Sequence, residues 1–157
     1  MDVFRIAKTR HIRDLMGEGP RLYGGRWNAS GTSVIYTAGS RSLASLEYLV
    51  HVPMPYEPLD LSIATISLPD DCTAEAVDVE ALPRGWRDHP APAVLADIGT
   101  DWVHRGESLV LWVPSVLVPD ESNIIINPGH LEMSGVTIKS VHPYAFDERL
   151  LKQKREA

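Results

Sequence analysis

The sequence predicts an α+β domain, with a mixed β-sheet and a few helices, folded as a single domain over residues 1–157. The length of 157 residues is typical of one domain. A composition of 44% hydrophobic and 23% charged residues is close to globular averages and argues against general disorder. Short β-branched segments mix with two or three helical segments without a regular βαβ alternation, which favours the α+β class.

The first half of the chain combines short strands with glycine-rich connections. The aromatic and β-branched residues of segment 33–37 are typical of a strand. Pro53 is expected to end the helix over 40–51. Gly17, Gly19 and Pro20 are expected to stop the helical turn before them. The expected elements are, in order, a strand over 3–7, a helical turn over 11–16, a loop over 23–31, a strand over 33–37 and a helix over 40–51.

The second half contains most of the expected strands. Residues 61–68 alternate apolar and polar side chains, as a half-buried strand does. Leu95, Ile98 and Trp102 recur at helical spacing. The expected elements are, in order, a strand over 61–68, a proline-rich irregular segment over 69–93 with one short helix, a helix over 93–104, strands over 109–113, 123–127 and 136–141, and a short polar helix over 147–156.

The charge of the chain is negative and unevenly distributed. A net charge of −6 argues against a nucleic-acid-binding protein, which normally has a basic balance. Residues 1–56 carry seven basic and four acidic side chains, whereas residues 57–157 carry eight basic and seventeen acidic ones. We therefore expect a small anionic ligand to bind the N-terminal third.

Several classes of site and location are not expected. Cys72 is the one cysteine, so the chain has no intrachain disulfide and no cysteine zinc site. The six histidines show no metal-ligand spacing, so we expect no metal. The N-terminus lacks the apolar stretch of a signal peptide, and the most apolar segment, 109–118, is too short to span a bilayer. We expect a soluble cytoplasmic protein without a membrane association.

Glu47 is the most informative single residue. At about 100° per residue, Leu43, Leu46, Glu47 and Val50 share one face of the expected helix, and we expect that face to pack inward. A carboxylate there is costly unless another group pairs with it. Either Glu47 lies at the border of the apolar stripe and reaches solvent, or it is held in a cleft, where such groups serve catalysis or bind a ligand hydroxyl.

The loop Gly24-Gly25-Arg26-Trp27-Asn28 is a candidate anion site. Its two glycines allow the backbone to approach a ligand closely. An arginine on such a loop can bind a phosphate through two parallel hydrogen bonds. The alternative is a plain turn with an exposed Arg26 and a packing tryptophan.

Ser115 follows a strand and Pro114, so its hydroxyl can point into a cleft at the strand end. The alternative is a serine that closes a turn. No histidine is placed by the sequence to activate it, and no Gly-x-Ser-x-Gly motif surrounds it. We therefore do not interpret Ser115 as the nucleophile of a hydrolase.

Taken together and in order, these segments resemble the RES domain family, the toxin component of RES–Xre toxin–antitoxin pairs. The arginine, glutamate and serine for which that family is named correspond to Arg26, Glu47 and Ser115. The match covers nearly the whole chain, but it is poor over residues 69–93. The matching segments are Phe4-Arg5-Ile6, Gly24–Asn28, Val34–Ala38, Leu43–Glu47, Leu111–Ser115, Asn123–Pro128 and Phe146–Leu150.

The resemblance implies a fold similar to that of the diphtheria-type ADP-ribosyltransferases and an enzyme that consumes NAD+. Two reactions are implied, and they remain alternatives. The first is depletion of NAD+ by cleavage of the nicotinamide–ribose bond, as an NAD glycohydrolase or phosphorylase. The second is mono-ADP-ribosylation of a protein such as phosphoribosyl pyrophosphate synthetase. A third alternative is a binding module without enzymatic activity. The joint presence of the motif residues disfavours it; these are Arg26, Tyr36, Glu47 and Ser115.

The resemblance also implies roles for individual residues. Glu47 would bind a ribose hydroxyl and stabilise the cation that forms at the ribose. Arg26 and Arg5 would hold the pyrophosphate of NAD+. Tyr36 would stack on the nicotinamide ring or close one wall of the site, and Ser115 would hydrogen-bond the ribose or the carboxamide.

The expected partner is an Xre-type helix-turn-helix antitoxin that blocks the active site. Four tryptophans in a chain with two phenylalanines are compatible with an interface, because tryptophan is enriched at binding hot spots, but they can equally fill the core. A homodimer is allowed by the same observation. The sequence does not separate water, phosphate and protein as acceptors of ADP-ribose, and it does not set the oligomeric state.

Overall fold

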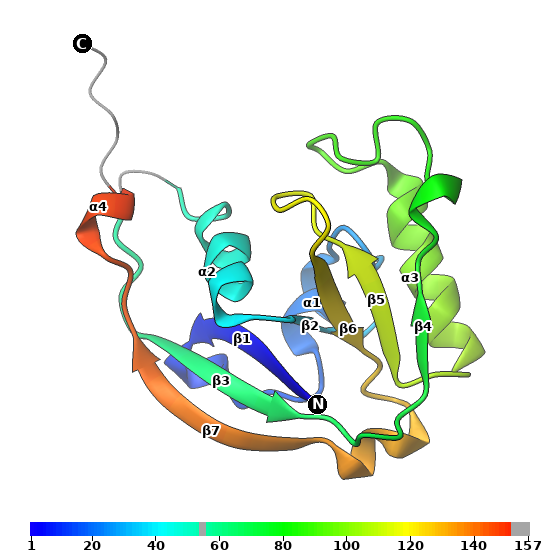
Figure 1. Ribbon diagram of the computed structural model, residues 1–157, viewed down its shortest axis with the longest axis horizontal. Coiled ribbons are helices and arrows are strands. Elements are labelled where there is room, and N and C mark those ends of the chain that lie inside the picture. The colour runs from blue at the N-terminus through cyan, green and yellow to red at the C-terminus, as the bar shows by residue number, and fades with distance from the viewer. Residues whose placement is uncertain (54–55, 152–157) are drawn as a thin grey trace.

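The computed structural model describes residues 1–53 and 56–151 as an open seven-stranded β-sheet surrounded by helices (Figure 1). The strands are β1 (Asp2–Lys8), β2 (Ile35–Ala38), β3 (Leu61–Ser67), β4 (Ala74–Ala76), β5 (Val110–Pro114), β6 (Ser122–Ile126) and β7 (Thr137–Tyr144). The α-helices are α1 (Glu18–Tyr23), α2 (Arg41–Leu49), α3 (Ala93–Arg105) and α4 (Glu148–Leu151). Short 3₁₀ helices span Thr9–His11, Val79–Ala81 and Leu131–Gly135.

The sheet has the strand order β4-β5-β6-β2-β1-β3-β7. Its pairs are antiparallel except β4 with β5. β1 pairs with β3 along its whole length, whereas one register pair, Phe4 with Ala38, joins β1 to β2. The sheet is therefore divided into a β1–β3–β7 half and a β2–β6–β5–β4 half.

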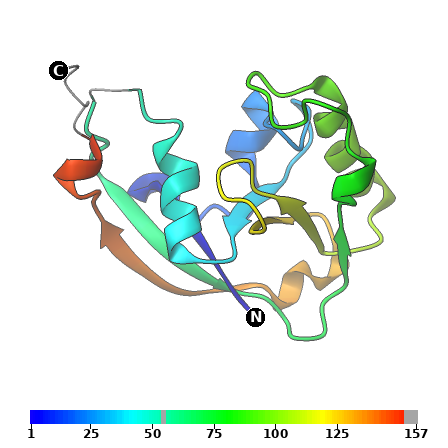
Figure 2. The ribbon, with the colours of Figure 1, turned by 45° about the horizontal axis from the view of Figure 1, so that its top comes forward.

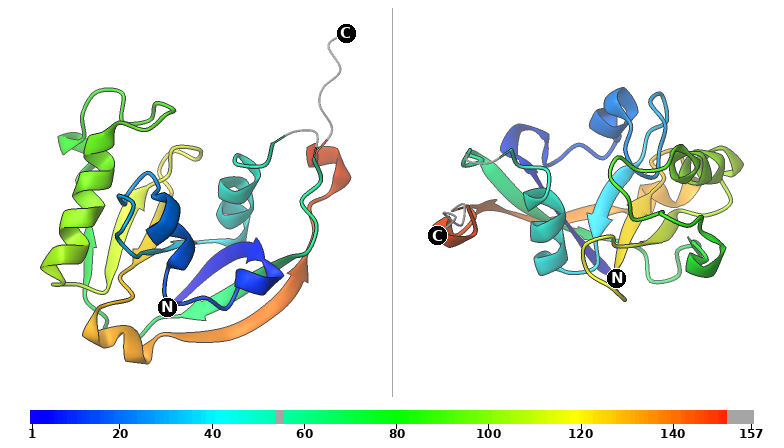
Figure 3. Two further views of the ribbon diagram at one scale, coloured as in Figure 1. Left: turned by 180° about the vertical axis from the view of Figure 1, so that it is seen from behind. Right: turned by 90° about the horizontal axis from the view of Figure 1, so that it is seen from above.

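Helices α2 and α3 stand over different halves of the sheet. In Figure 1, α2 lies above β1 and β2, and α3 runs alongside β4 and β5. The turned views show the connection between β5 and β6 between these two helices (Figures 2 and 3). This arrangement brings the end of β5 and the start of β6 close to α2.

Separate clusters of buried side chains form under the two helices. Trp27, Leu95 and Trp102 belong to the cluster at α3, and Tyr36 packs against it. Leu43 and Ala38 belong to the cluster at α2. Because side chains two positions apart on a strand share a face, Tyr36 and Ala38 link the two clusters on one face of β2.

The α+β class with a mixed sheet is confirmed. The expectation for residues 11–16 was wrong, because the structure has a 3₁₀ helix over Thr9–His11 and an α-helix over Glu18–Tyr23. Pro20 was expected to stop a helix, but it lies in the first turn of α1, where its missing N–H has no intrahelical partner. The Asp14 carboxylate accepts hydrogen bonds from the backbone N–H groups of Met16 and Glu18 and so supports the start of α1.

Helix α2 forms within the predicted 40–51 range, and the Ser40 hydroxyl caps it by accepting a hydrogen bond from Leu43 N. The predicted apolar face was partly wrong. Leu43 is buried, but Leu46 and Val50 are 43% and 55% exposed. The inward face is rotated toward Ala44 and Tyr48, which pack in the cluster with Phe146, so Glu47 lies at the border of the buried face.

The segment 69–93 contains a strand that the sequence did not predict. Ala74–Ala76 form β4, which pairs in parallel with β5. Its Ala-Glu-Ala sequence has weak strand propensity, so the pairing with β5 determines the conformation. The short helix expected in this segment corresponds to Val79–Ala81.

The C-terminal helix begins close to its predicted start. Its described part is α4, over Glu148–Leu151, and the rest of the predicted 147–156 helix lies outside the described residues. Among the helices in the described ranges, none is long and apolar enough to cross a membrane.

Candidate active site

The Glu47 carboxylate is held between α2 and the start of β6. Its Oε1 atom accepts a hydrogen bond of 2.8 Å from the Ser115 hydroxyl and one of 2.6 Å from the Asn123 side-chain amide. Glu47 itself is half-buried. Its Oε2 atom receives no hydrogen bond from the described residues, so one carboxylate oxygen is held by two donors and the other has none among those residues.

All the hydrogen-bonding capacity of the Ser115 hydroxyl is used within the protein. Its single proton goes to Glu47, and its oxygen accepts hydrogen bonds of 3.1 Å from the backbone N–H groups of Leu117 and Val118. Ser115 is 2% exposed. The structure therefore brings Ser115 together with Glu47, while a direct contact between Ser115 and a substrate stays a prediction.

The glycine–arginine loop is tied to β2 through Tyr36. The Tyr36 hydroxyl donates a hydrogen bond of 2.7 Å to the Asn28 side chain and accepts one of 3.1 Å from Trp27 N. A Cβ atom at Gly25 would lie 2.7 Å from the Tyr36 hydroxyl oxygen, so a larger residue there would have to displace that hydroxyl. Asn28 is buried, and its amide also donates to the carbonyl of Pro20.

Helix α3 fixes the same loop from the other side. Gly99 is buried in α3, and a Cβ atom there would lie 1.7 Å from the carbonyl oxygen of Trp27. The Trp27 side chain is buried in the cluster that contains Leu95 and Trp102. The loop that carries Arg26 is therefore rigid, which disfavours its interpretation as a plain turn.

Arg26 projects from this loop toward the segment before α3. Its guanidinium donates hydrogen bonds of 2.7 Å to the carbonyl of Trp86 and 3.1 Å to that of Asp88. Both acceptors are neutral, and three of the five guanidinium N–H groups donate to none of the described residues. Arg26 thus keeps an uncompensated charge and the free donors that an anion needs.

Arg5 is held in a different place. Its side chain donates hydrogen bonds of 2.6 Å to the Asp14 carbonyl and 2.5 Å to the His11 carbonyl. Burial lowers the pKa of the Arg5 guanidinium, and the nearby Asp14 charge opposes that shift. Among the described contacts, none joins Arg5 to Arg26, Tyr36, Glu47 or Ser115, so the structure does not bring it together with the other predicted residues.

The strand register connects the Glu47 pair with the Tyr36 loop. Asn123 lies opposite Ala38, and Tyr36 lies opposite Ile125. Tyr36 and Asn123 are therefore diagonal neighbours on one face, a relation that places side chains about 7–8 Å apart. Burial raises the pKa of Tyr36 well above its usual range, so its hydroxyl stays protonated at neutral pH.

Asn123 and Asn28 are polar contacts of this site to which sequence reasoning assigned no role. Both residues stood in matched segments, but an asparagine has no distinctive spacing signal. Their function as hydrogen-bond partners arises from the pairing of β2 with β6 and from the fold of the loop. Only the strand register that sets Asn123 opposite Ala38 could have identified Asn123 as a residue of this site.

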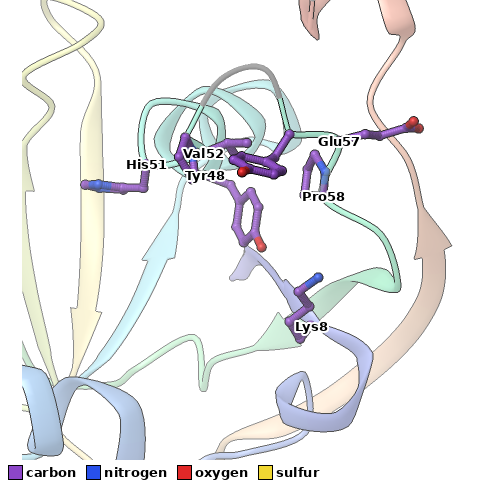
Figure 4. Close-up of a pocket in the computed structure, with 8 residues that line it drawn as sticks. Lys8, Tyr48, His51, Val52, Glu57 and Pro58 are labelled. Atoms are coloured by element: carbon purple, nitrogen blue, oxygen red, sulfur yellow. The ribbon is translucent and has the colours of Figure 1, made fainter.

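A separate pocket of about 280 Å³ lies on another side of α2 (Figure 4). It is lined by Lys8, Tyr48, Val52, Tyr56 and other residues near the end of the helix. In Figure 4 the side chains of His51 and Glu57 point away from the other lining residues. None of the predicted site residues lines this pocket, and we assign it no role.

Known proteins similar to this chain include several toxins. The RES domain family model matches residues 2–147. A "Toxin Res" of Yersinia enterocolitica is 40% identical over 96% of this chain and 99% of its own length. A "Prs ADP-ribosylating toxin" of a Sphingobium species is 37% identical over 94% of this chain and 92% of its own.

A solved structure supports the fold. A chain of the M. tuberculosis MbcT–MbcA toxin–antitoxin complex aligns with a TM-score of 0.71, covering 96% of this chain and 86% of that chain at 15% identity. At that identity the match supports the fold alone. The family model covers almost the whole chain, and relatives above 30% identity match nearly end to end, so this chain belongs to the RES domain family.

Proposed function

We propose that this protein is the toxin of a type II toxin–antitoxin system and that it depletes NAD+ by cleaving the nicotinamide–ribose bond. The observation that carries the proposal is the half-buried Glu47 carboxylate. Its Oε1 atom accepts hydrogen bonds from Ser115 and Asn123, whereas its Oε2 atom accepts none from the described residues. The toxin relatives support the biological role.

The chemistry requires a fixed negative charge. When the bond between ribose C1′ and the nicotinamide nitrogen breaks, both electrons leave with nicotinamide, which becomes neutral. The ribose then resembles an oxocarbenium ion, as in glycoside cleavage. A preorganised carboxylate stabilises such a cation without having to reorient during the reaction. Oε2 of Glu47 would bind a ribose hydroxyl and place this charge beside C1′.

Arg26 would bind the pyrophosphate of NAD+. Its free N–H groups and rigid loop suit a bidentate contact with phosphate oxygens. Arg5, the second residue predicted for the pyrophosphate, donates to the Asp14 and His11 carbonyls away from Arg26 and Glu47, so this proposal assigns the pyrophosphate to Arg26. Tyr36 would contribute the wall of the site between Arg26 and Glu47. Its hydroxyl is engaged with the loop, which leaves its ring for contact with nicotinamide.

After nicotinamide has left, water would attack C1′ and lose one proton to solvent, or an anionic phosphate oxygen would attack C1′ with no proton to lose. Ser115 is not required as a nucleophile, because water or phosphate attacks C1′ directly in this reaction. Its role in this proposal is to hold the carboxylate. NAD+ is therefore the substrate, and the proposed reaction uses no metal.

Transfer of ADP-ribose to a protein is a second candidate. The Sphingobium relative, 37% identical, is named an ADP-ribosylating toxin. In this reaction a side chain of the acceptor protein, such as phosphoribosyl pyrophosphate synthetase, would replace water at C1′. The same Glu47 and Arg26 contacts would serve both reactions.

An antitoxin partner is proposed with the toxin role. The similar M. tuberculosis structure is a toxin–antitoxin complex. We propose a helix-turn-helix antitoxin of the Xre type that covers the Glu47 site and thereby prevents NAD+ from binding. The location in the cytoplasm, where NAD+ is available, follows from the same proposal.

The test is the loss of NAD+ with the purified protein, freed from any antitoxin, in buffers with and without phosphate. Release of nicotinamide in both buffers identifies a glycohydrolase, and loss that needs phosphate identifies a phosphorylase. If neither buffer supports loss, labelled NAD+ is added to cell lysate. Label on a protein then supports the second candidate, and absence of label together with intact NAD+ contradicts both.

A further inference from the structure

Asn123 has an unusual pattern of hydrogen bonds. Its amide nitrogen donates to Glu47 Oε1 at 2.6 Å, the shorter of the two bonds that this oxygen accepts. Its own carbonyl oxygen, Oδ1, is buried and accepts no hydrogen bond from the described residues. The side chain is thus half satisfied, and its one described bond goes to the candidate catalytic carboxylate.

An acceptor left without a donor in a buried position disfavours the folded state. A residue retained for stability alone would not have this pattern, because an apolar side chain would avoid the cost. Asn123 occupies a site in the middle of the sheet, opposite Ala38 on one side and Val113 on the other. Both neighbours are apolar and offer no side-chain donor to Oδ1.

Two donors on one carboxylate oxygen restrict its orientation more than one donor does. The last torsion of a glutamate side chain has a broad, roughly two-fold preference, so a single hydrogen bond leaves the carboxylate free to rotate. Ser115 approaches Oε1 from the β5–β6 connection, and Asn123 approaches it from β6. Together they hold Oε1 in place and leave Oε2 in a defined direction.

We infer that Asn123 is a positioning residue that acts through Glu47: its amide fixes the carboxylate so that Oε2 faces the ribose of NAD+. This inference rests on the proposed NAD+-consuming function. The chemistry requires a hydrogen-bond donor at this position, because a donor stabilises the negative carboxylate. An isosteric carboxylate would present an acceptor to Oε1 and push Glu47 away.

The first experiment measures kcat and KM for NAD+ in the variants Asn123→Ala and Asn123→Asp, together with thermal unfolding. We expect kcat to fall at least about tenfold in both variants, with the larger loss for Asn123→Asp. KM is expected to stay within about threefold of wild type, since Asn123 binds Glu47 and not the pyrophosphate. The Tm of Asn123→Ala is expected to stay within a few degrees, because the orphaned acceptor is removed with the amide.

The matched control is Ser122→Asp. It adds the same negative charge to the same strand, one residue away and on the other face of the sheet. We expect its kcat to stay within about twofold of wild type. A kcat loss in Ser122→Asp equal to that in Asn123→Asp would show a nonspecific charge effect and overturn the inference.

The second experiment does not depend on activity. Crystal structures of wild type and Asn123→Ala are compared at the Glu47 side chain. We expect one carboxylate orientation in wild type and more than one in the variant. The same orientation in both would overturn the positioning role. Wild-type kcat in Asn123→Ala would overturn it as well.

The two experiments separate this inference from the proposed function. If the wild-type protein consumes no NAD+ with water, phosphate or protein acceptors, the proposed function fails, and the crystal structures alone decide whether Asn123 positions Glu47. If the wild-type protein consumes NAD+ and the Asn123 variants match it in kcat, the proposed function stands and the positioning role fails.

Discussion

Replacing Ser115 by alanine is expected to reduce stability and NAD+ consumption together. The substitution removes the 2.8 Å hydrogen bond to Glu47 and the acceptor used by the backbone N–H groups of Leu117 and Val118. A hydrogen bond to a charged group contributes about 1.5–3 kcal/mol to the free energy of unfolding. Leu117 is exposed, so water can replace part of the lost contact with the amides.

The expected net loss in the free energy of unfolding is about 2–3 kcal/mol. For a domain of this size, each kcal/mol corresponds to a Tm shift of about 2–4 °C, so we expect Ser115→Ala to lower Tm by about 4–12 °C. The rate of NAD+ loss is expected to fall about 10–100-fold, because the carboxylate that stabilises the cation is held less firmly.

The assay combines thermal unfolding with NAD+ loss measured well below the Tm of the variant. The control is Ser134→Ala, an exposed serine whose hydroxyl donates a 3.3 Å hydrogen bond to the Leu131 carbonyl. We expect that control to match wild type in both measurements. Wild-type Tm and wild-type NAD+ loss in Ser115→Ala would refute the reasoning, since the Glu47 contact would then contribute nothing.

Three further predictions concern other contacts. Arg26→Ala is expected to raise KM for NAD+ at least about tenfold, and Arg26→Lys is not expected to restore it, because an ammonium lacks the bidentate geometry; steady-state kinetics would check both. Gly99→Ala, whose Cβ would lie 1.7 Å from the Trp27 carbonyl oxygen, is expected to lower the free energy of unfolding by about 1–3 kcal/mol or more in a denaturant titration. Hydrogen bonds from Thr73 lower the pKa of the Glu132 carboxylate in the folded protein. This carboxylate therefore stabilises the fold at pH values above its unfolded pKa near 4.5, and the stabilisation is lost as the pH falls through its lower folded pKa. Glu132→Gln should therefore lower Tm at pH 7 and have little effect near pH 2.

The local elements of this fold were predictable from sequence because each has a local cause. The near-alternation of apolar and polar residues over 61–67 predicted a strand correctly, although its burial does not alternate and five of its seven residues are buried. Ser40 caps the helix that begins at Arg41. The strand β4 was not predictable, because Ala74–Ala76 become a strand through pairing with β5. Helix α1 was missed because a proline was interpreted as a stop when it occupies the first turn.

The candidate site was predictable to the extent that single residues carry chemistry. Glu47 was singled out because a carboxylate lies on an apolar helix face, and the structure pairs it with the predicted Ser115. The exposure of Leu46 and Val50 shows that the helix is rotated relative to the predicted face. The contact from Asn123 depends on the register between β2 and β6, which no local pattern encodes.

The most direct test of the central claim is the rate of NAD+ loss in Glu47→Gln. Glutamine keeps the shape of the side chain but removes the negative charge, so we expect the rate to fall at least about a hundredfold while the protein stays folded. Glu57→Gln is the matched control, because it removes an exposed carboxylate outside the site, and we expect wild-type loss there. Wild-type NAD+ loss in a folded Glu47→Gln variant would contradict the account.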